Sequence, residues 1–463
     1  MLSRSRRRCD RAHGTHRGAP QLLPILAAIA WLQARNGLQT PVVVWPQVTV
    51  QARDWVVYLG PFVAAAAVWM GARERRHGME DLLATTPHPA WRRRGATWAA
   101  TTLWGLLAYV AVAAGILAYG AARATWGTPL AWPFCWPLLI GLLALPAHAA
   151  LGFALGRYAP SRFTPPLVAI ALLLVQGYVG GAIGEGARVP AWLPYWAAYL
   201  SPAVYVDQSV WFGVTPNLCG PQALYLLGLT ALALGGLAGG DGRCLPRWGA
   251  PLAGAALLVA GVILISRTAP TVKAGNPVMK SAVEARGVQL IPYAPLCGGA
   301  PVVVCVHPAY SARLHDAAAL VNRVVAPVYG LPGVPTRAVQ RSSGHDAPAD
   351  ALVFYPITGA MGDEGAAAVV AVQLAWGRVA RYDVTIDGQS SVHITGDGAR
   401  TMLWLWLMRQ AGYNVPPPAQ GFGNEVVATE QRFAALPTAT QRAWLRAHYA
   451  ALREGRVPLW SIP

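Results

Sequence analysis

The chain has 463 residues, of which 54% are hydrophobic and only 12% are charged, and its mean hydropathy is +0.36. Proteins that expose much of their surface to lipid have this balance, so a soluble enzyme is disfavoured. The formal net charge of +17 could suggest nucleic acid binding, but all except two of the 37 basic residues are arginine, and many flank apolar runs. We therefore interpret the charge as a membrane-topology signal and expect no nucleic acid partner.

The first 19 residues form a basic segment that contains Arg4, Arg6, Arg7, Arg8 and Arg11. A signal peptide also begins with basic residues, but the segment Ala34-Arg35-Asn36 is a poor match to a small-x-small cleavage site. We predict that residues 1–19 are a basic cytoplasmic leader.

Seven apolar runs follow, each near the roughly 20 residues that a helix needs to cross a bilayer. We predict a membrane all-α bundle of about seven transmembrane helices within residues 20–268. The predicted spans are 20–34, 55–71, 96–119, 133–156, 164–184, 220–239 and 249–266. The aromatic connection 185–221 favours short re-entrant or interfacial helices, because Trp and Tyr prefer the membrane interface.

The arginines of the connections indicate the orientation. Sixteen of them lie in the leader and in the second, fourth and sixth connections, whereas the other face holds four: Arg35, Arg53, Arg123 and Arg188. Because Lys and Arg accumulate in cytoplasmic loops, the N-terminus is expected inside and the chain after Ser266 outside. The expected location is the plasma (cytoplasmic) membrane.

Ionisable side chains are nearly absent from the predicted spans, in which only His148 stands out. Ion-coupled carriers usually place carboxylates or His near the midplane, so this pattern argues against that class. For His148 a packed or water-facing position is favoured over a proton relay.

The loop between the second and third spans is polar and rich in arginine, yet it holds the apolar pair Leu82-Leu83. With the six spans from about 20 to 239 and the basic leader, this loop resembles the permease subunits of type-two ABC exporters. In that family the loop forms a coupling helix that docks on the ATPase subunit. The resemblance carries this role to Glu74, Gly78, Glu80, Leu82, Leu83, Thr86 and Pro87. The side chains suit this docking role. The two leucines offer an apolar contact surface, and Glu80 and Asp81 can pair with basic residues of a partner. Pro87 would end the helix. An ordinary amphipathic loop helix on the bilayer surface is the alternative.

The chain contains no Gly-x-x-x-x-Gly-Lys-Ser/Thr motif, so it cannot bind ATP by that device. The resemblance therefore implies a separate ABC ATPase subunit, a homo- or heterodimer of permease subunits in the lipid bilayer, and no cofactor on this chain. A seventh span and a long tail are departures from the family pattern.

Residues 269–463 are more polar and predict an extracytoplasmic α+β or α/β domain. Strands are expected at 288–291, 302–306, 351–355 and 384–386, and helices at 315–325, 365–376, 398–410 and 438–453.

The cysteines give no spacing typical of a metal cluster, and no metal site is predicted. Cys297 and Cys305 are the only two in the tail, and outside the cytoplasm a disulfide between them would suit a small hairpin. Two separately packed thiols are an equally good interpretation.

The tail lacks a His-Glu-x-x-His pair and a Gly-x-Ser-x-Gly elbow, so no catalytic residue is assigned. The most suggestive group is His307, Tyr310 and His315, although a His such as His307 more often hydrogen-bonds in a turn. Three functions stay open. The first is an ABC permease exporting an amphipathic or lipid-like substrate, the second is a membrane-anchored sensor or assembly protein, and the third is a membrane-bound hydrolase.

Overall fold

The computed structural model describes most of the chain in segments. These are residues 42–79, 90–128, 130–133, 135–184, 195–204, 210–214, 216–238, 249–268, 288–291, 293–340, 350–354, 362–377, 398–415 and 423–463, with Thr85 and five isolated residues between 28 and 35. The chain divides into two compact units, 43–291 and 292–463, apart from a few residues near the N-terminus. Each unit is described by itself.

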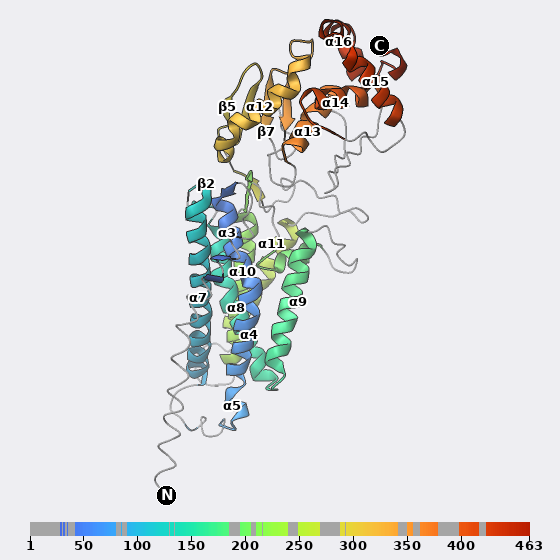
Figure 1. Ribbon diagram of the computed structural model, residues 1–463. Coiled ribbons are helices and arrows are strands. Elements are labelled where there is room, and N and C mark those ends of the chain that lie inside the picture. Colours follow the sequence, from blue (N-terminus) through green and yellow to red (C-terminus); the bar gives the residue numbers. More distant parts are fainter. Residues whose placement is uncertain are drawn as a thin grey trace, which may run out of the picture. The chain divides into compact units, whose positions relative to one another are not determined.

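The first unit is a bundle of apolar helices that run alternately up and down (Figure 1). Its helices are α3 (Trp45–Asp54), α4 (Val56–Gly71), α5 (Arg73–Arg76), α7 (Ala90–Arg123), α8 (Trp136–Tyr158), α9 (Thr164–Gly184), α10 (Pro216–Ala238), α11 (Gly249–Thr268) and the short η1 (Tyr195–Leu200). Prolines stand in the first turn of α3 and α8, where the missing N–H costs no helical hydrogen bond.

Five helical segments among the described residues are long and apolar enough to cross a membrane. They are Trp45–Gly71, Ala90–Arg123, Trp136–Tyr158, Pro216–Gly236 and Gly249–Arg267. A multi-pass helical membrane bundle is therefore the architecture that this unit supports. The predicted span 20–34 lies almost wholly outside the described residues. In α9 the side chains are described only as far as Gly177, and that part is shorter than a full span.

The second predicted span was too short, and its predicted start at residue 55 was wrong. Helix α3 precedes α4 with only Trp55 between them, so the apolar segment begins at Trp45. This extension moves Arg53 from the predicted outer connection into the helical segment, where it is fully buried. The expectation that His148 is the one notable ionisable residue of the spans was therefore also wrong.

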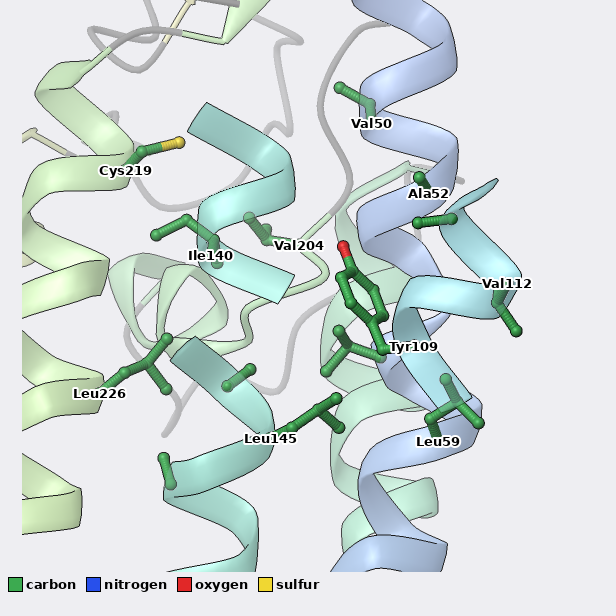
Figure 2. Close-up of a cluster of buried hydrophobic side chains, with 14 of the residues drawn as sticks. Val50, Ala52, Leu59, Tyr109, Val112, Ile140, Leu145, Val204, Cys219 and Leu226 are labelled. Carbon is green, nitrogen blue, oxygen red and sulfur yellow. The ribbon is translucent and has the colours of Figure 1, made fainter. Parts of the chain in front are cut away.

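Buried aliphatic and aromatic side chains from α3, α4, α7, α8 and α10 form the core of the bundle. Figure 2 shows Leu59, Tyr109, Ile140, Leu145 and Leu226 among them. Two glycines of α8 bring this helix against α4. A Cβ atom at Gly152 would lie 2.3 Å from the Ala64 carbonyl oxygen, and one at Gly156 would lie 2.2 Å from that of Val68. Small residues at such positions allow the backbones to approach closely.

Two short two-stranded sheets complete this unit. Strand β1 (Val43–Val44) pairs in parallel with β2 (Ala124–Trp126), and β3 (Phe212–Val214) pairs antiparallel with β4 (Val288–Leu290). Strand β4 forms where the sequence predicts a strand of the tail, but its partner β3 belongs to the first unit. The predicted domain boundary after residue 268 stays a prediction, because residues 269–287 are outside the described part.

The second unit contains a four-stranded mixed sheet with helices. Strand order is β5 (Leu296–Gly298), β6 (Val303–Val306), β7 (Arg337–Gln340) and β8 (Ala351–Phe354); β5 is antiparallel to β6, and the other pairs are parallel. The helical elements are η2 (Pro308–Arg313), α12 (Leu314–Val325), η3 (Ala326–Val328), α13 (Gly362–Trp376), α14 (Gly398–Gln410), α15 (Gly423–Ala435), α16 (Thr438–Arg453) and η5 (Leu459–Ser461). Helix α12 lies between β6 and β7 in the chain, as a parallel pair requires.

Most predicted elements of the tail form, namely β6, β8, α12, α13, α14 and α16. The predicted strand 384–386 lies outside the described residues. Strands β5 and β7 and helix α15 were not predicted from the sequence.

Candidate functional site

The loop that resembles a coupling helix follows α4 directly. Glu74 lies on α5, and Gly78 adopts a left-handed backbone conformation with φ of 60° that ends the helical turn. The remaining predicted residues, Glu80, Asp81, Leu82, Leu83, Thr86 and Pro87, fall outside the described part of the chain.

The two ends of this loop are tied together by charge. Glu74 accepts a hydrogen bond from Arg93 of α7, with Nε 3.1 Å from Oε1, and Arg94 Nε lies 3.8 Å from the other carboxylate oxygen. The guanidinium of Arg76 lies over the Trp69 ring of α4 at 3.6 Å from its centre. The bases of α4, α5 and α7 are therefore connected by side chains.

This end of the bundle is also the arginine-rich end. Eight arginines of the described residues lie on it, at the α5–α7 loop and at the turn between α8 and α9: Arg73, Arg75, Arg76, Arg92, Arg93, Arg94, Arg157 and Arg162. Of the four arginines expected on the opposite face, Arg53 is buried in the helices. Among the described residues, Arg35 and Arg123 are then the arginines that stay assigned to that face.

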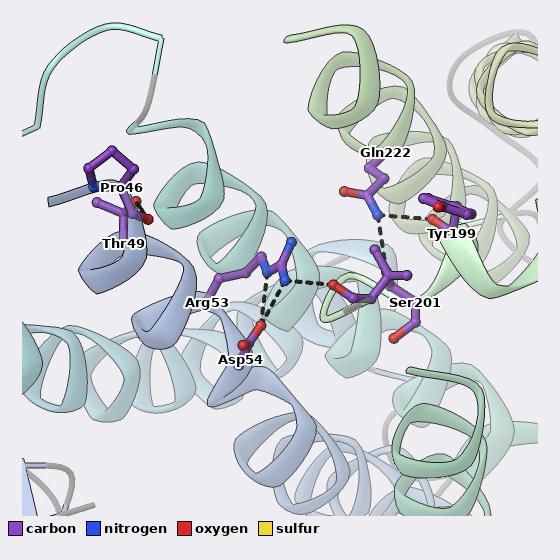
Figure 3. A network of polar contacts seen from close by, with 8 residues as sticks. Pro46, Thr49, Arg53, Asp54, Tyr199, Ser201 and Gln222 are labelled. Atoms are coloured by element: carbon purple, nitrogen blue, oxygen red, sulfur yellow. Dashed lines mark hydrogen bonds and ion pairs between the residues drawn. The ribbon is translucent and has the colours of Figure 1, made fainter. Parts of the chain in front are cut away.

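A buried polar network lies in the part of the bundle nearer the opposite end. Arg53, with no exposed surface, pairs with the carboxylate of Asp54, and its Nη2 also donates to the Val204 carbonyl oxygen at 2.7 Å. Figure 3 shows both interactions. From the sequence, Arg53 was expected in a loop. One sequence signal could have placed it correctly, namely Trp45-Pro46. A proline in the first turn marks the start of a helix, and a helix that starts there includes Arg53.

Gln222 of α10 completes the network from the other side. Its Nε2 donates to the carbonyl oxygens of Tyr199 and Ser201, at 2.9 and 3.0 Å (Figure 3). The backbone N–H of Val204 donates to the Ser201 carbonyl, so residues 201–204 form a turn. We call this segment the 201–204 turn; Arg53 holds one end of it and Gln222 the other.

Several polar atoms of this network have no hydrogen-bond partner among the described residues. They are Nη1 of Arg53, Oγ of Ser201 and Oε1 of Gln222, and the hydroxyl of the neighbouring Tyr109 shares this property. Buried polar atoms are nearly always hydrogen-bonded in folded proteins. Arg53 Nη1, Ser201 Oγ, Gln222 Oε1 and the Tyr109 hydroxyl are therefore exceptions to this rule within the bundle.

His148 contributes a second, smaller polar contact within the bundle. Its Nε2 lies 2.8 Å from the side-chain nitrogen of Gln176 on α9, and the ring is buried against Gly60 of α4. Within the described residues this position fits a packed histidine between helices.

The three tail residues singled out in the sequence have different environments. His307 is fully buried, and its Nδ1 accepts a hydrogen bond from the Ala309 N–H at the start of η2. Tyr310 is also buried and donates its backbone N–H to the His307 carbonyl, whereas His315 is exposed on α12. Burial lowers the pKa of His307 to about 4, so its ring is neutral near pH 7. This geometry favours a capping role for His307, stabilising a turn.

Cys297 and Cys305 face each other across the β5–β6 hairpin and form a disulfide bond. The pairing that the sequence left open is therefore the one that the structure contains. Cys135 and Cys219 are free thiols.

The second unit also has a cavity of 330 Å³ at the amino ends of β7 and β8. Arg453 of α16 lies along its wall and donates to the Gly333 carbonyl oxygen at 2.8 Å, and Asp350 and Gln373 also line it. No group of three or more His, Cys, Asp or Glu residues able to hold a metal occurs in the described segments.

Comparison with known proteins yields no matching family model, no matching curated protein and no matching solved structure.

Proposed function

We propose that the chain is the permease subunit of a type-two ABC exporter, with the arginine-rich end of the bundle and the N-terminus in the cytoplasm. The tail is then an extracytoplasmic domain. The observation that carries the proposal is the connection of Glu74 on α5 to Arg93 and Arg94 on α7. A loop that transmits force must be joined to the helices that it moves, and this connection joins the base of the loop to a possible span on each side.

The mechanism that follows is indirect. A separate ATPase dimer closes when it binds ATP and pushes on the loop 77–89, in which Leu82 and Leu83 supply the apolar contact. Because α5 is joined to α4 and α7, the push tilts these helices against the rest of the bundle. Two paired permease chains then rock to an outward-open state and release an amphipathic or lipid-like substrate.

Copurification tests this proposal. The tagged chain is isolated from its native membrane in a mild detergent, and its partners are identified by mass spectrometry. An ATP-binding cassette subunit in stoichiometric amount supports the permease. Recovery without any ATPase, under conditions that preserve other membrane complexes, would instead support a sensor or assembly protein that displays the tail. Hydrolysis that is lost in His307→Ala while export persists would support the hydrolase.

A further inference from the structure

The feature that leads beyond this function is the cavity of 330 Å³ in the second unit. Its volume lies at the lower end of the roughly 300–1,000 Å³ found for small-molecule sites, so it suits a small ligand. Arg453 of α16 and Asp350, next to β8, contribute opposite charges to its lining. Apolar side chains line another part of the cavity, namely those of Val334, Pro335, Ala351 and Leu352.

Arg453 is held at the wall of the cavity by its own contacts. Its Nη1 donates to the Gly333 carbonyl oxygen at 2.8 Å, and its guanidinium lies 5.7 Å from the centre of the Tyr449 ring. Glycines with positive φ stand beside both terminal nitrogens. A Cβ atom at Gly333 would lie 3.4 Å from Nη1, and one at Gly377 would lie 3.1 Å from Nη2. Nη2 has no acceptor among the described residues, so the positioned guanidinium keeps N–H donors for a ligand.

Asp350 supplies the opposite charge at the protein surface, because its side chain is exposed. Both residues belong to the described part of the chain, and no ion pair joins them. Opposite charges that share a cavity without neutralising each other are complementary to a ligand with one anionic and one cationic group. An α-amino acid has this combination. Its planar carboxylate matches a guanidinium, and its ammonium group matches a carboxylate.

We propose that this cavity binds a small apolar α-amino acid. The ligand carboxylate accepts hydrogen bonds from Arg453, the ammonium group pairs with Asp350, and the side chain lies against Val334 and Leu352. This inference goes beyond the proposed function and does not rest on it, because binding needs no ATPase.

The test measures binding to the purified full-length chain in a neutral sugar detergent, by isothermal titration calorimetry. The probes are leucine, 4-methylpentanoate and 3-methylbutylamine. The second probe is leucine without its amino group, and the third is leucine without its carboxylate. We expect saturable binding of leucine, at least about tenfold tighter than that of either analogue, since each analogue loses its interaction with one charged side chain.

Asp350→Asn tests the ammonium position. The change is at an exposed residue, so the fold should persist. It should weaken leucine binding by about tenfold or more and leave the binding of 4-methylpentanoate unchanged, because that probe has no ammonium group. Asp316→Asn is the matched control, at an exposed aspartate of α12, and should bind leucine like the wild type.

Arg453→Lys tests the carboxylate position. Lysine keeps the positive charge but lacks the planar pair of terminal nitrogens. This variant should bind leucine and 4-methylpentanoate about tenfold or more weakly, with the binding of 3-methylbutylamine unchanged. Arg446→Lys, at an exposed arginine of the same helix, should bind all three probes like the wild type. If Arg453→Lys does not fold, Asp350→Asn still decides the proposal.

Three results would overturn the proposal. One is the absence of saturable leucine binding below about 1 mM. Another is equally tight leucine binding by the wild type and Asp350→Asn. The third is binding of either analogue as tight as that of leucine, which would show that the cavity does not recognise both charges. Since none of these measurements involves the ATPase, they leave the copurification result to decide the permease function.

Discussion

Glu74 of α5 and Arg93 of α7 form an ion pair with 3.1 Å between Oε1 and Nε, and both side chains are about three-quarters buried. The pair closes the loop 77–89 at its base. Together with Arg94, which lies 3.8 Å from the other carboxylate oxygen, it joins the single turn of α5 to α7.

Glu74→Ala should loosen this loop without unfolding the bundle. A partly exposed ion pair contributes less than about 1 kcal/mol, so the melting temperature should change little. Amide hydrogen exchange should rise in residues 73–89 and stay unchanged in α8. If amide exchange in residues 73–89 is equally fast in the wild type and in the variant, the ion pair does not order the loop.

Arg53 and Asp54 should show strong coupling in stability. Removing one partner of a buried pair typically costs about 3–5 kcal/mol, and the one-third exposure of Asp54 reduces the expected cost to about 1–3 kcal/mol. We expect Arg53→Met or Asp54→Asn alone to lower the thermal stability of the detergent-solubilised chain. The double variant should lose less than the sum of the two. If the stability loss of the double variant equals the sum of the two single losses, the ion pair makes no net contribution to stability.

The disulfide between Cys297 and Cys305 tests the outward location of the tail. In protein denatured directly from native membranes, Cys135 and Cys219 should react with an alkylating reagent at once, and the hairpin pair only after reduction. A separation of 8 residues in sequence implies that replacing both hairpin cysteines with Ser destabilises the second unit by about 2–3 kcal/mol. Immediate alkylation of Cys297 and Cys305 would indicate a reducing compartment instead.

His307 should make the second unit less stable in mild acid. Its pKa is about 4 in the folded chain against 6.5 for the free side chain, so between these values the unfolded chain binds more protons. Stability should therefore fall as the pH is lowered from about 6.5 to 4. His307→Asn keeps an acceptor for the Ala309 N–H and should remove this part of the dependence. His448→Asn, at an exposed histidine, should retain it.

The sequence predicted long elements better than buried polar contacts. Helix α12 has an apolar face at helical spacing and α16 follows Pro437, so both could be located from local pattern alone. Strands β6 and β8 are equally short but are unbroken apolar runs, whereas β5 contains Gly298 and β7 begins with Arg337 and ends with Gln340, so these two give a weaker strand signal.

The contacts of Arg53 could not be predicted from its neighbours for a different reason. Its partner Val204 lies 151 positions away, and only the packing of α3 against the 201–204 turn brings the two together. A charged residue at the edge of an apolar run is ordinarily assigned to a loop. Here that assignment fails, because tertiary contacts accommodate the charge inside the helical bundle. The assignment of the α5–α7 loop as a coupling element stays a prediction, and it needs only local pattern because its arginines and leucines are close together in the chain.

The loop's docking role is tested most directly by copurification of matched variants. Leu82→Asp with Leu83→Asp replaces the predicted apolar knob. Leu130→Asp changes an exposed leucine in the connection that follows α7 and β2, beyond the far end of this helix of 34 residues or about 51 Å. All chains are isolated from native membranes at equal abundance, and bound ATPase is quantified by mass spectrometry. We expect the wild type and Leu130→Asp to retain an ATP-binding cassette subunit and the Leu82/Leu83 variant to lose at least about nine-tenths of it, since buried apolar contacts dominate such interfaces. Undiminished ATPase on the Leu82/Leu83 variant would contradict the account.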